Sequence, residues 1–183
     1  MPTKKLFGVV LATLVALLLI APLCIAEPDS VNMSPYTVTF DLGVPTSSYE
    51  VSVSRPVESE TLAGDSSTDY VFEISDKWTD AHYITVGVYV KSYDSQDVLT
   101  PDSLLVILES TLRDMGGENI QSAIRTIDGR DGCVASCDVG DFTFYAAQYV
   151  ISTYPCTYVV IASTYPWDEG TLSLIKTIHV EGP

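Results

Sequence analysis

The sequence predicts an α+β domain, with an antiparallel β-sheet of about six to eight strands and two helices packed on it. Two observations support this prediction. Short segments in which apolar and polar residues alternate recur from residue 36 to residue 163, as expected for half-buried strands. Helical spacing of apolar residues occurs at about 101–115, between strands, and at about 168–178, near the end. Runs of strands with one inserted and one terminal helix are typical of helices packed on an antiparallel sheet.

The runs FTFYAAQYVI and CTYVVIAS, which flank a turn at 152–155, are expected to form the centre of the sheet. They are the longest runs of β-branched and aromatic residues after the N-terminal segment, a composition that favours strands. In the final helix, Leu172, Ile175 and Ile178 share a face that should dock on the sheet, with Leu174 beside them. Lys176 and His179 are placed in its last turn, where a positive charge suits the helix dipole.

The first half of the domain reads as strands joined by turns. Residues 36–42 and 49–53 alternate on either side of a cluster of turn residues, which predicts a β-hairpin. Residues 57–68 are polar and are predicted to form a loop. Strands follow at 69–75 and 82–93, and their expected inner residues are Tyr70, Phe72, Ile74, Ile84, Val86, Val88 and Val90.

The inserted helix has clear predicted ends. Thr100 can cap it, Pro101 suits its first position and Gly116 with Gly117 should end it. Its apolar stripe is Leu104, Leu105, Leu108 and Leu112. An antiparallel meander then follows, with strands at 119–127 and 133–137 around a five-residue turn, and a second turn at 138–141.

The N-terminal segment predicts export. Lys4 and Lys5 precede an uncharged apolar stretch, and the sequence before residue 27 fits a signal peptidase site after Ala26. The alternative is an uncleaved anchor, because roughly 20 apolar residues suffice to span a bilayer. We therefore expect a signal peptide or membrane anchor at 1–26, a flexible leader at 27–35 and a single domain at 36–183. Either reading places the domain outside the cytoplasm, secreted or attached to the outer face of the cytoplasmic membrane.

The chain is strongly acidic, with a formal net charge of −15. Cleavage after Ala26 removes two of the nine basic residues and none of the 24 acidic ones, which leaves −17. Such a balance disfavours binding to nucleic acid and to anionic membrane surfaces. It fits a solvated surface, or alternatively the capture of cations or of a basic partner.

Three cysteines remain after cleavage: Cys133, Cys137 and Cys156. On one straight strand Cys133 and Cys137 lie about 13 Å apart, which is too far for a disulfide. We interpret them as buried thiols; a metal site that uses all three is the alternative.

The order of elements resembles that of the PsbP-like superfamily, which includes the extrinsic photosystem II protein and related bacterial lipoproteins. The matching stretches are YTVTFDLG with YEVSVSRP, IDGRDG before the meander, and AAQYVI…YVVIASTYPWDEGTLSLIKTI at the end. The resemblance spans nearly all of the chain after the leader. It implies an accessory or partner-binding module more often than an enzyme, and it transfers no catalytic residues.

The sequence contains no recognised catalytic motif and no phosphate-binding loop. His82 beside Asp80 is the candidate centre of an alternative function, an extracytoplasmic hydrolase. A second alternative is a divalent-cation module, with Asp128, Asp131, Asp138 and Asp141 as candidate ligands. Asp and Gly also suit tight turns, and the two Asp pairs should lie at opposite edges of the sheet. We expect no cofactor.

The tyrosines are the candidate partner-binding residues. Tyr83, Tyr89 and Tyr93 share one strand face, Tyr145 and Tyr149 share another, and Tyr158 lies on the neighbouring strand. If these faces coincide and no helix covers them, they form an aromatic platform for a sugar or a protein.

Asn32 lies in a glycosylation acceptor pattern, Asn-Met-Ser, followed by Pro35. We therefore expect an exported, non-catalytic domain that binds a protein or ligand at the cell envelope, touching a membrane only through an uncleaved N-terminus.

Overall fold

The structure is a computed structural model, and it describes residues 28–60, 66–78, 83–92, 99–164 and 169–183. The signal peptide or anchor predicted at 1–26, the candidate His82 with Asp80, and Tyr93 lie outside the described residues. Within those residues, no helix is both long enough and apolar enough to cross a bilayer.

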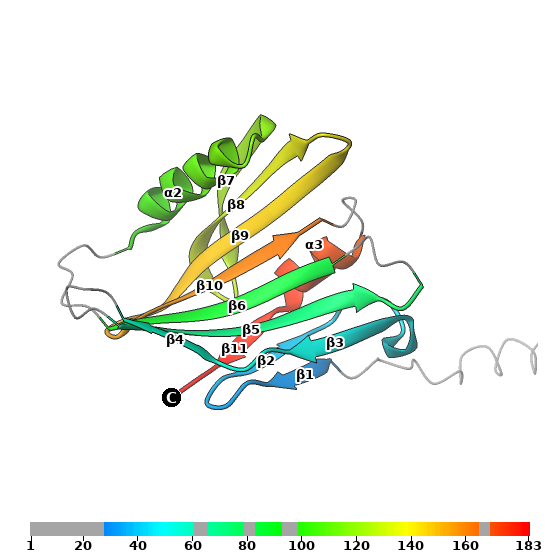
Figure 1. The fold of residues 1–183 in the computed structure, drawn as a ribbon, viewed down its shortest axis with the longest axis vertical. Helices are drawn as coiled ribbons and strands as arrows, with labels where there is room; N and C mark the ends of the chain where they lie inside the picture. Colours follow the sequence, from blue (N-terminus) through cyan, green and yellow to red (C-terminus); the bar gives the residue numbers. More distant parts are fainter. Residues whose placement is uncertain (1–27, 61–65, 79–82, 93–98, 165–168) are drawn as a thin grey trace, which may run out of the picture.

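The described residues form an α+β fold with one large antiparallel sheet, one small sheet and two α-helices (Figure 1). The eight-stranded sheet comprises β3 (Tyr49–Val53), β4 (Val57–Glu60), β5 (Ser66–Asp76), β6 (Tyr83–Ser92), β7 (Glu118–Ile127), β8 (Arg130–Val139), β9 (Phe142–Thr153) and β10 (Cys156–Ser163). The three-stranded sheet comprises β1 (Asp29–Asn32), β2 (Thr37–Phe40) and β11 (His179–Glu181). The helices are α2 (Pro101–Asp114) and α3 (Glu169–Thr177). The predicted fold class is confirmed.

The strand order of the large sheet is β3-β5-β6-β10-β9-β8-β7, with β4 paired to β5. The hairpin β9–β10 therefore lies at its centre, as its apolar sequence predicts. In register, Val159 of β10 lies between Val88 of β6 and Tyr149 of β9, and all three side chains are fully buried. Strands buried in this way must be continuously apolar on their inner face, which explains the long β-branched runs.

The main core lies between the two sheets. The rings of Phe40 on β2 and Phe72 on β5 stack with centroids 5.7 Å apart, and Tyr36 meets Tyr70 edge to face at 5.1 Å. Val38 is fully buried between them. The alternation predicted for residues 36–42 and 69–75 is confirmed, because these residues supply the inner faces of both layers.

The predicted hairpin between residues 36–42 and 49–53 is wrong. β2 pairs with β1 and β11 in the small sheet, whereas β3 pairs with β5 in the large sheet. The single 3₁₀ turn Thr46–Ser48 carries the chain from one layer to the other. Because Phe40 packs face to face on Phe72, β2 must lie across the core from the large sheet and not beside its strands.

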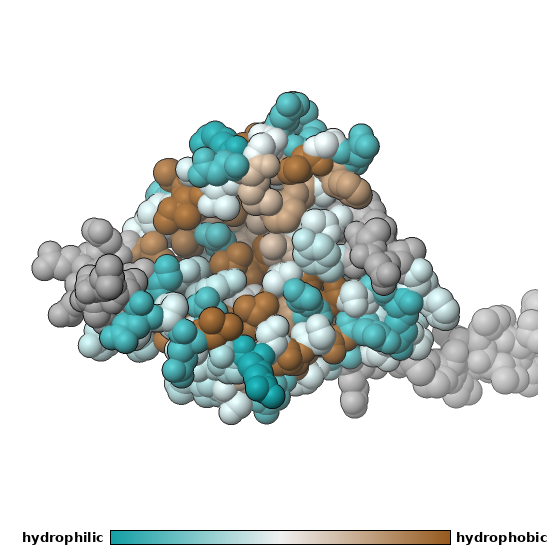
Figure 2. All heavy atoms as spheres, in the orientation of Figure 1, coloured by the Kyte–Doolittle hydropathy of each residue, from teal (hydrophilic) through white to brown (hydrophobic). Residues whose placement is uncertain are grey.

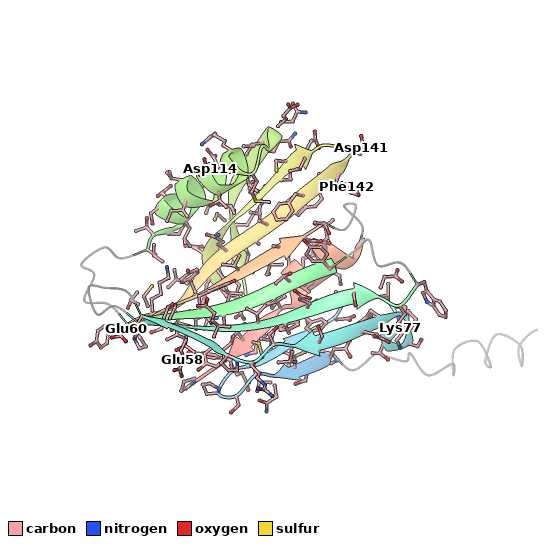
Figure 3. The ribbon with its side chains drawn as sticks, in the orientation of Figure 1. Glu58, Glu60, Lys77, Asp114, Asp141 and Phe142 are labelled. Atoms are coloured by element: carbon pink, nitrogen blue, oxygen red, sulfur yellow. The ribbon has the colours of Figure 1, made fainter. Side chains whose placement is uncertain are left out.

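Two segments expected to lack structure contribute strands. Asp29–Asn32, expected in a flexible leader, forms β1, and Val31 is buried opposite Val38. Residues 57–60, expected in a loop, form the edge strand β4 with the sequence VESE, and every residue of it is exposed. Figure 3 shows Glu58 and Glu60 on this strand. Charged side chains on an edge strand discourage pairing with other chains, so its polar sequence is compatible with a strand.

Helix α2 begins and ends as predicted. The Ser103 amide donates to Thr100 Oγ1 at 3.2 Å and the Thr100 amide donates to Ser103 Oγ at 2.8 Å, which forms a capping box. Gly116 follows the helix with φ +80°, a conformation that favours glycine. Three leucines of the stripe are buried against β7, β8 and β9: Leu104, Leu108 and Leu112.

Helix α3 differs from its prediction in the face that it buries. Leu174 and Ile178 are buried together with Thr171, whereas Leu172 and Ile175 are only partly buried. The helix ends at Thr177, so His179 lies in β11 and not in a last helical turn. The docking face is therefore rotated toward Leu174, because the short helix packs against β2 as well as the large sheet.

The β7–β8 connection has two residues instead of the predicted five. Asp128 and Gly129 form the turn with φ of +52° and +68°. Positive φ at both central positions is typical of the tight hairpin turns that Asp-Gly favours. The flanking residues of the expected loop, Arg130 and Asp131, pair with β7 instead.

Candidate functional site

The candidate tyrosines lie on two opposite faces of the large sheet. Side chains of successive strand residues point to opposite faces. On β6, Ile84, Val86 and Val88 point into the main core, so Tyr83 and Tyr89 point away from it. Tyr158 is the cross-strand partner of Tyr89 and points the same way.

Tyr145 and Tyr149 of β9 point to the other face, the side of α3 and the small sheet. Tyr149 is fully buried, and its hydroxyl donates to Asp128 Oδ2 at 3.4 Å. Burial raises the pKa of Tyr149 strongly, and the negative charge of Asp128 raises it further. Tyr149 is thus a core residue with no surface for a partner, and the predicted single platform of tyrosines divides into separate groups.

Tyr89 and Tyr158 form a stacked pair. Their ring centroids are 5.3 Å apart with an interplanar angle of 17°, and Lys91 Nζ lies 5.3 Å from the Tyr158 centroid. A Cβ atom at Gly87 would lie 2.5 Å from Cε2 of Tyr89, so this glycine allows the ring to lie against the strand. Burial, then Asp69 and Tyr158, raise the pKa of Tyr89, which keeps its hydroxyl protonated.

Among the described elements, helix α2 makes its main contacts with β7, β8 and β9. Within the described residues, no helix covers the same side of β5, β6 and β10; we name it the open face. Figure 2 shows hydrophobic side chains between polar ones across the middle of this side of the molecule. The outward-pointing residues of the open face that are only partly buried include Asp69, Val71, Thr85, Tyr89, Cys156, Tyr158, Val160 and Ala162.

The four candidate aspartates do not converge. Asp128 lies at the β7–β8 turn, whereas Asp138 and Asp141 lie at the β8–β9 end, where Figure 3 shows Asp141 beside Phe142. Asp131 and Asp141 are exposed, and Asp138 accepts a hydrogen bond from Asn119 Nδ2 at 2.9 Å. Among the residues that the structure describes, no three His, Cys, Asp or Glu side chains are grouped to hold a metal ion.

Asp128 instead joins the two sheets. Its side chain is 5% exposed and lies 2.9 Å from Arg130 Nη1 and 2.7 Å from His179 Nδ1. The Val180 amide of β11 also donates to it, at 3.2 Å. A buried carboxylate requires such partners, so this residue serves the fold rather than a ligand.

The cysteines are thiols in the structure. Cys133 and Cys137 are buried beneath α2, and Cys156 is half-buried on the open face. Burial raises the pKa of all three thiols, that of Cys133 from 9.0 to about 11. A thiol that stays protonated is a poor nucleophile and a poor metal ligand, which agrees with a packing role.

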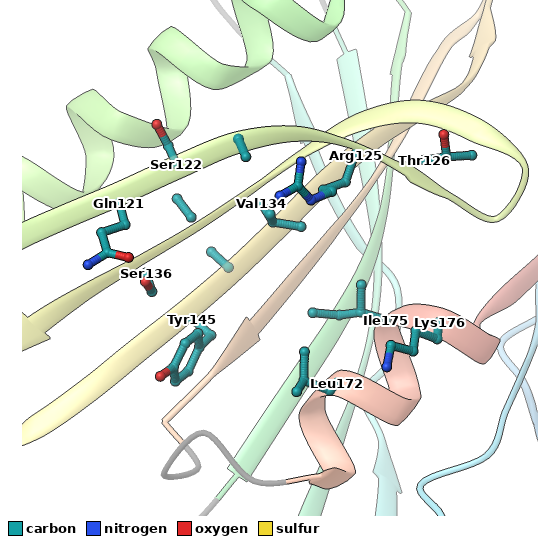
Figure 4. Close-up of a pocket in the computed structure, with 13 residues that line it drawn as sticks. Gln121, Ser122, Arg125, Thr126, Val134, Ser136, Tyr145, Leu172, Ile175 and Lys176 are labelled. Atoms are coloured by element: carbon teal, nitrogen blue, oxygen red, sulfur yellow. The ribbon is translucent and has the colours of Figure 1, made fainter.

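A cavity of about 490 Å³, the α3 pocket, lies on the sheet face opposite α2 (Figure 4). Cross-strand register places its sheet residues in rows, Gln121 with Ser136 and Tyr145, then Ala123 with Val134. Figure 4 shows Leu172, Ile175 and Lys176 presented by α3 toward these strands. Arg125 of β7 completes the rim. The sequence analysis did not predict this site; alternation along β7, which places Gln121, Ala123 and Arg125 on one face, is a signal that could have pointed to it.

Asn32, the candidate glycosylation residue, lies exposed in β1, and its Oδ1 accepts a hydrogen bond from the Ser34 amide at 2.8 Å.

Comparisons with protein-family models, with curated proteins and with solved structures found no match. The function must therefore be inferred from the surfaces of this chain.

Proposed function

We propose that this chain is an exported, non-catalytic domain that binds a protein partner through the open face at the cell envelope. The signal-like N-terminal sequence supports export, and the resemblance to the PsbP-like superfamily supports an accessory role. The observation that carries the proposal is the stacked pair Tyr89–Tyr158 among partly exposed apolar side chains, on strands that no described helix covers.

The chemistry of the open face favours a protein over a sugar. Tyrosine side chains offer a large apolar surface with a hydroxyl at the tip, and they are enriched at protein interfaces. Sugars bind by stacking on a bare aromatic face. Here the Tyr158 ring is stacked on Tyr89 and has the Lys91 ammonium over it, so the protein itself supplies partners for the ring.

The charge of the chain indicates the character of the partner. With 24 acidic and nine basic residues, the surface attracts a basic protein and repels other acidic ones. Asp69 and Glu73 on β5 flank the apolar centre of the open face, which places negative charge at its rim. We therefore expect the partner to present apolar residues with a basic border.

Affinity enrichment from native envelope extract tests the proposal with a matched pair of variants. Tyr89→Ser removes one ring of the stacked pair, whereas Tyr154→Ser removes a ring that is 81% exposed and lies in the β9–β10 turn, outside the strands themselves. We expect the same specific protein to be enriched by the wild type and by Tyr154→Ser and lost with Tyr89→Ser. Equal enrichment by a folded Tyr89→Ser variant would contradict the proposed surface.

A further inference from the structure

We propose that the α3 pocket binds a single-chain organic anion, an amphiphile with a carboxylate or similar head group. This site lies on the opposite side of the sheet from the open face and goes beyond the proposed function. Its volume, about 490 Å³, falls in the range of pockets that hold small organic ligands.

Most of the surface that lines the pocket is apolar, although Gln121, Ser122, Thr126 and Ser136 also line it. Leu172 and Ile175 of α3 face Val134 across the cavity, and the Tyr145 ring closes one end (Figure 4). Ala123, the cross-strand partner of Val134, also lines the cavity. Leu174 of the helix and Ile178 directly after it are buried in the main core. Leu172 is only partly buried, and Ile175 packs only partly against that core. Two neighbouring aliphatic side chains on a helix, left partly exposed above a sheet, provide a surface for an alkyl chain.

The charge at the rim is positive in a strongly acidic chain. Arg125 and Lys176 both line the pocket, and no Asp or Glu does. Among the described residues neither cation forms an ion pair; the Arg125 guanidinium donates to the backbone carbonyl of Ile124 at 3.0 Å. Cations gathered without counter-charges raise the local concentration of anions.

The surroundings also fix the orientation of the ligand. Asp138 follows Ser136 by two residues on β8 and so points to the same face, and its Oδ1 accepts a hydrogen bond from Thr143 Oγ1 at 3.2 Å, two residues before Tyr145 on β9. The negative charge of Asp138 also contributes, after burial, to the raised pKa of Tyr145. An anionic head group is therefore disfavoured at the Tyr145 end. The head group is placed near Arg125 and Lys176, and the chain extends past Ala123 and Val134 toward Tyr145.

Titration calorimetry with the full chain tests this proposal. The probe is decanoate, and decan-1-ol and decyltrimethylammonium are the uncharged and cationic probes of equal chain length. We expect decanoate to bind at one site at least about tenfold more tightly than either. Absence of decanoate binding, or equal binding of decan-1-ol, would overturn the proposal.

Variants locate the site. Arg125→Gln with Lys176→Gln should weaken decanoate binding about tenfold or more. Arg55→Gln with Lys77→Gln changes the net charge equally at exposed positions outside the pocket and should leave the affinity unchanged. Equal weakening by both pairs would mean a general charge effect and would overturn the assignment.

Ala123→Phe tests the cavity without touching its charges. The ring fills space between β7 and α3, so decanoate binding should be lost while the melting temperature without ligand changes little. Retained binding in a folded Ala123→Phe protein would overturn the location. Tyr89→Ser should bind decanoate with the affinity of the wild type, because Tyr89 does not line the pocket. A failure of the pocket proposal can therefore be distinguished from a failure of the proposed partner surface.

Discussion

Asp128 shows how one side chain can connect distant parts of a fold. It adopts a left-handed conformation at the β7–β8 turn and places its carboxylate, 5% exposed, against Arg130, His179 and the Val180 amide. Each contact is charge-assisted or involves a backbone donor, so the carboxylate is well compensated for its burial. The large sheet and the β11 strand of the small sheet are thereby held together.

Replacing Asp128 by Gly should lower the free energy of unfolding by about 1–3 kcal/mol, because donors lose a buried acceptor. Glycine keeps the positive φ of the turn, so the loss reports the carboxylate and not the backbone. Asp128→Asn should cost less, since its amide oxygen still accepts a hydrogen bond. Urea denaturation measures the free energy of unfolding of both variants. A loss below about 0.5 kcal/mol for Asp128→Gly is typical of a surface substitution and would contradict the proposed role of the carboxylate.

The buried thiols predict an alkaline loss of stability. In the unfolded chain Cys133 ionises near its ordinary pKa of 9.0, whereas in the folded chain it keeps its proton to about pH 11. The unfolded state thus binds fewer protons in this window, and the free energy of unfolding falls as pH rises. The slope from one such group is at most about 1.4 kcal/mol per pH unit.

Urea denaturation between pH 8 and pH 10.5 checks this expectation. Cys133→Ala should flatten the decline, whereas Cys156→Ala, at a half-buried position, should change it less. Buried Tyr149 contributes in the same direction at higher pH. Identical pH dependence in wild type and Cys133→Ala would show that this thiol is not the source.

At the scale of elements, the two helices differ in how well the sequence defines them. Helix α2 has a capping box, a proline at its start and a leucine stripe that points at one neighbour, so its ends and its face were predicted correctly. Helix α3 has nine residues and aliphatic side chains on several sides. Its core-facing residues could not be chosen by spacing alone, because Leu172 and Ile175 serve the pocket wall.

The rotated face of α3 gives a direct prediction. Leu174→Ala should lower the free energy of unfolding by about 2–5 kcal/mol, the range for a fully buried leucine. Ile175→Ala, at a partly buried position, should cost about 1 kcal/mol. Chemical denaturation of the two variants measures the difference in free energy of unfolding. A larger cost for Ile175→Ala than for Leu174→Ala would contradict the observed face and favour the one predicted from the sequence.

Three short strands, β1, β4 and β11, could not be predicted from the sequence. β1, β4 and β11 have four, four and three residues, too few for a period to be recognised. β2 pairs with β11, whose residue His179 lies opposite Thr39, 140 residues earlier in the chain. No local sequence pattern reveals a pairing between strands so far apart. The hairpin prediction failed for the same reason: turn residues at 43–48 show that the chain reverses, but not which layer it enters.

The candidate site was predictable only in part. Strand alternation placed Tyr83 and Tyr89 on one face of their strand. The stacking of Tyr89 on Tyr158 was not predicted, because it depends on β6 pairing with β10. The burial of Tyr149 and the absence of a helix over β5, β6 and β10 depend on tertiary packing. The α3 pocket joins β7 to a helix about 50 residues later, so its lining residues share no sequence pattern.

At the scale of the whole molecule, the core between the sheets unites both ends of the chain. Residues of β1, β2, α3 and β11 pack with β5, β6, β9 and β10 in one cluster. The open face and the α3 pocket lie on opposite sides of the large sheet, so a partner and a small ligand can be bound together without competing for residues.

This shared core predicts cooperative unfolding. Native-state hydrogen exchange should give the Val38 amide of β2 nearly the same opening free energy as the Val88 amide of β6, the value for global unfolding. Both side chains are fully buried in the same cluster. A much lower value for Val38 would show that the small sheet opens independently.

On the proposed function, the open face contacts a protein partner at the cell envelope. Site-specific photo-crosslinking tests it directly, with the reactive residue placed at Glu73 or at Glu58. Both are exposed glutamates on strands of the large sheet, and register places them on opposite faces. We predict one defined adduct from position 73 in intact envelopes and none from position 58. No adduct from position 73, or the same adducts from both positions, would contradict the account.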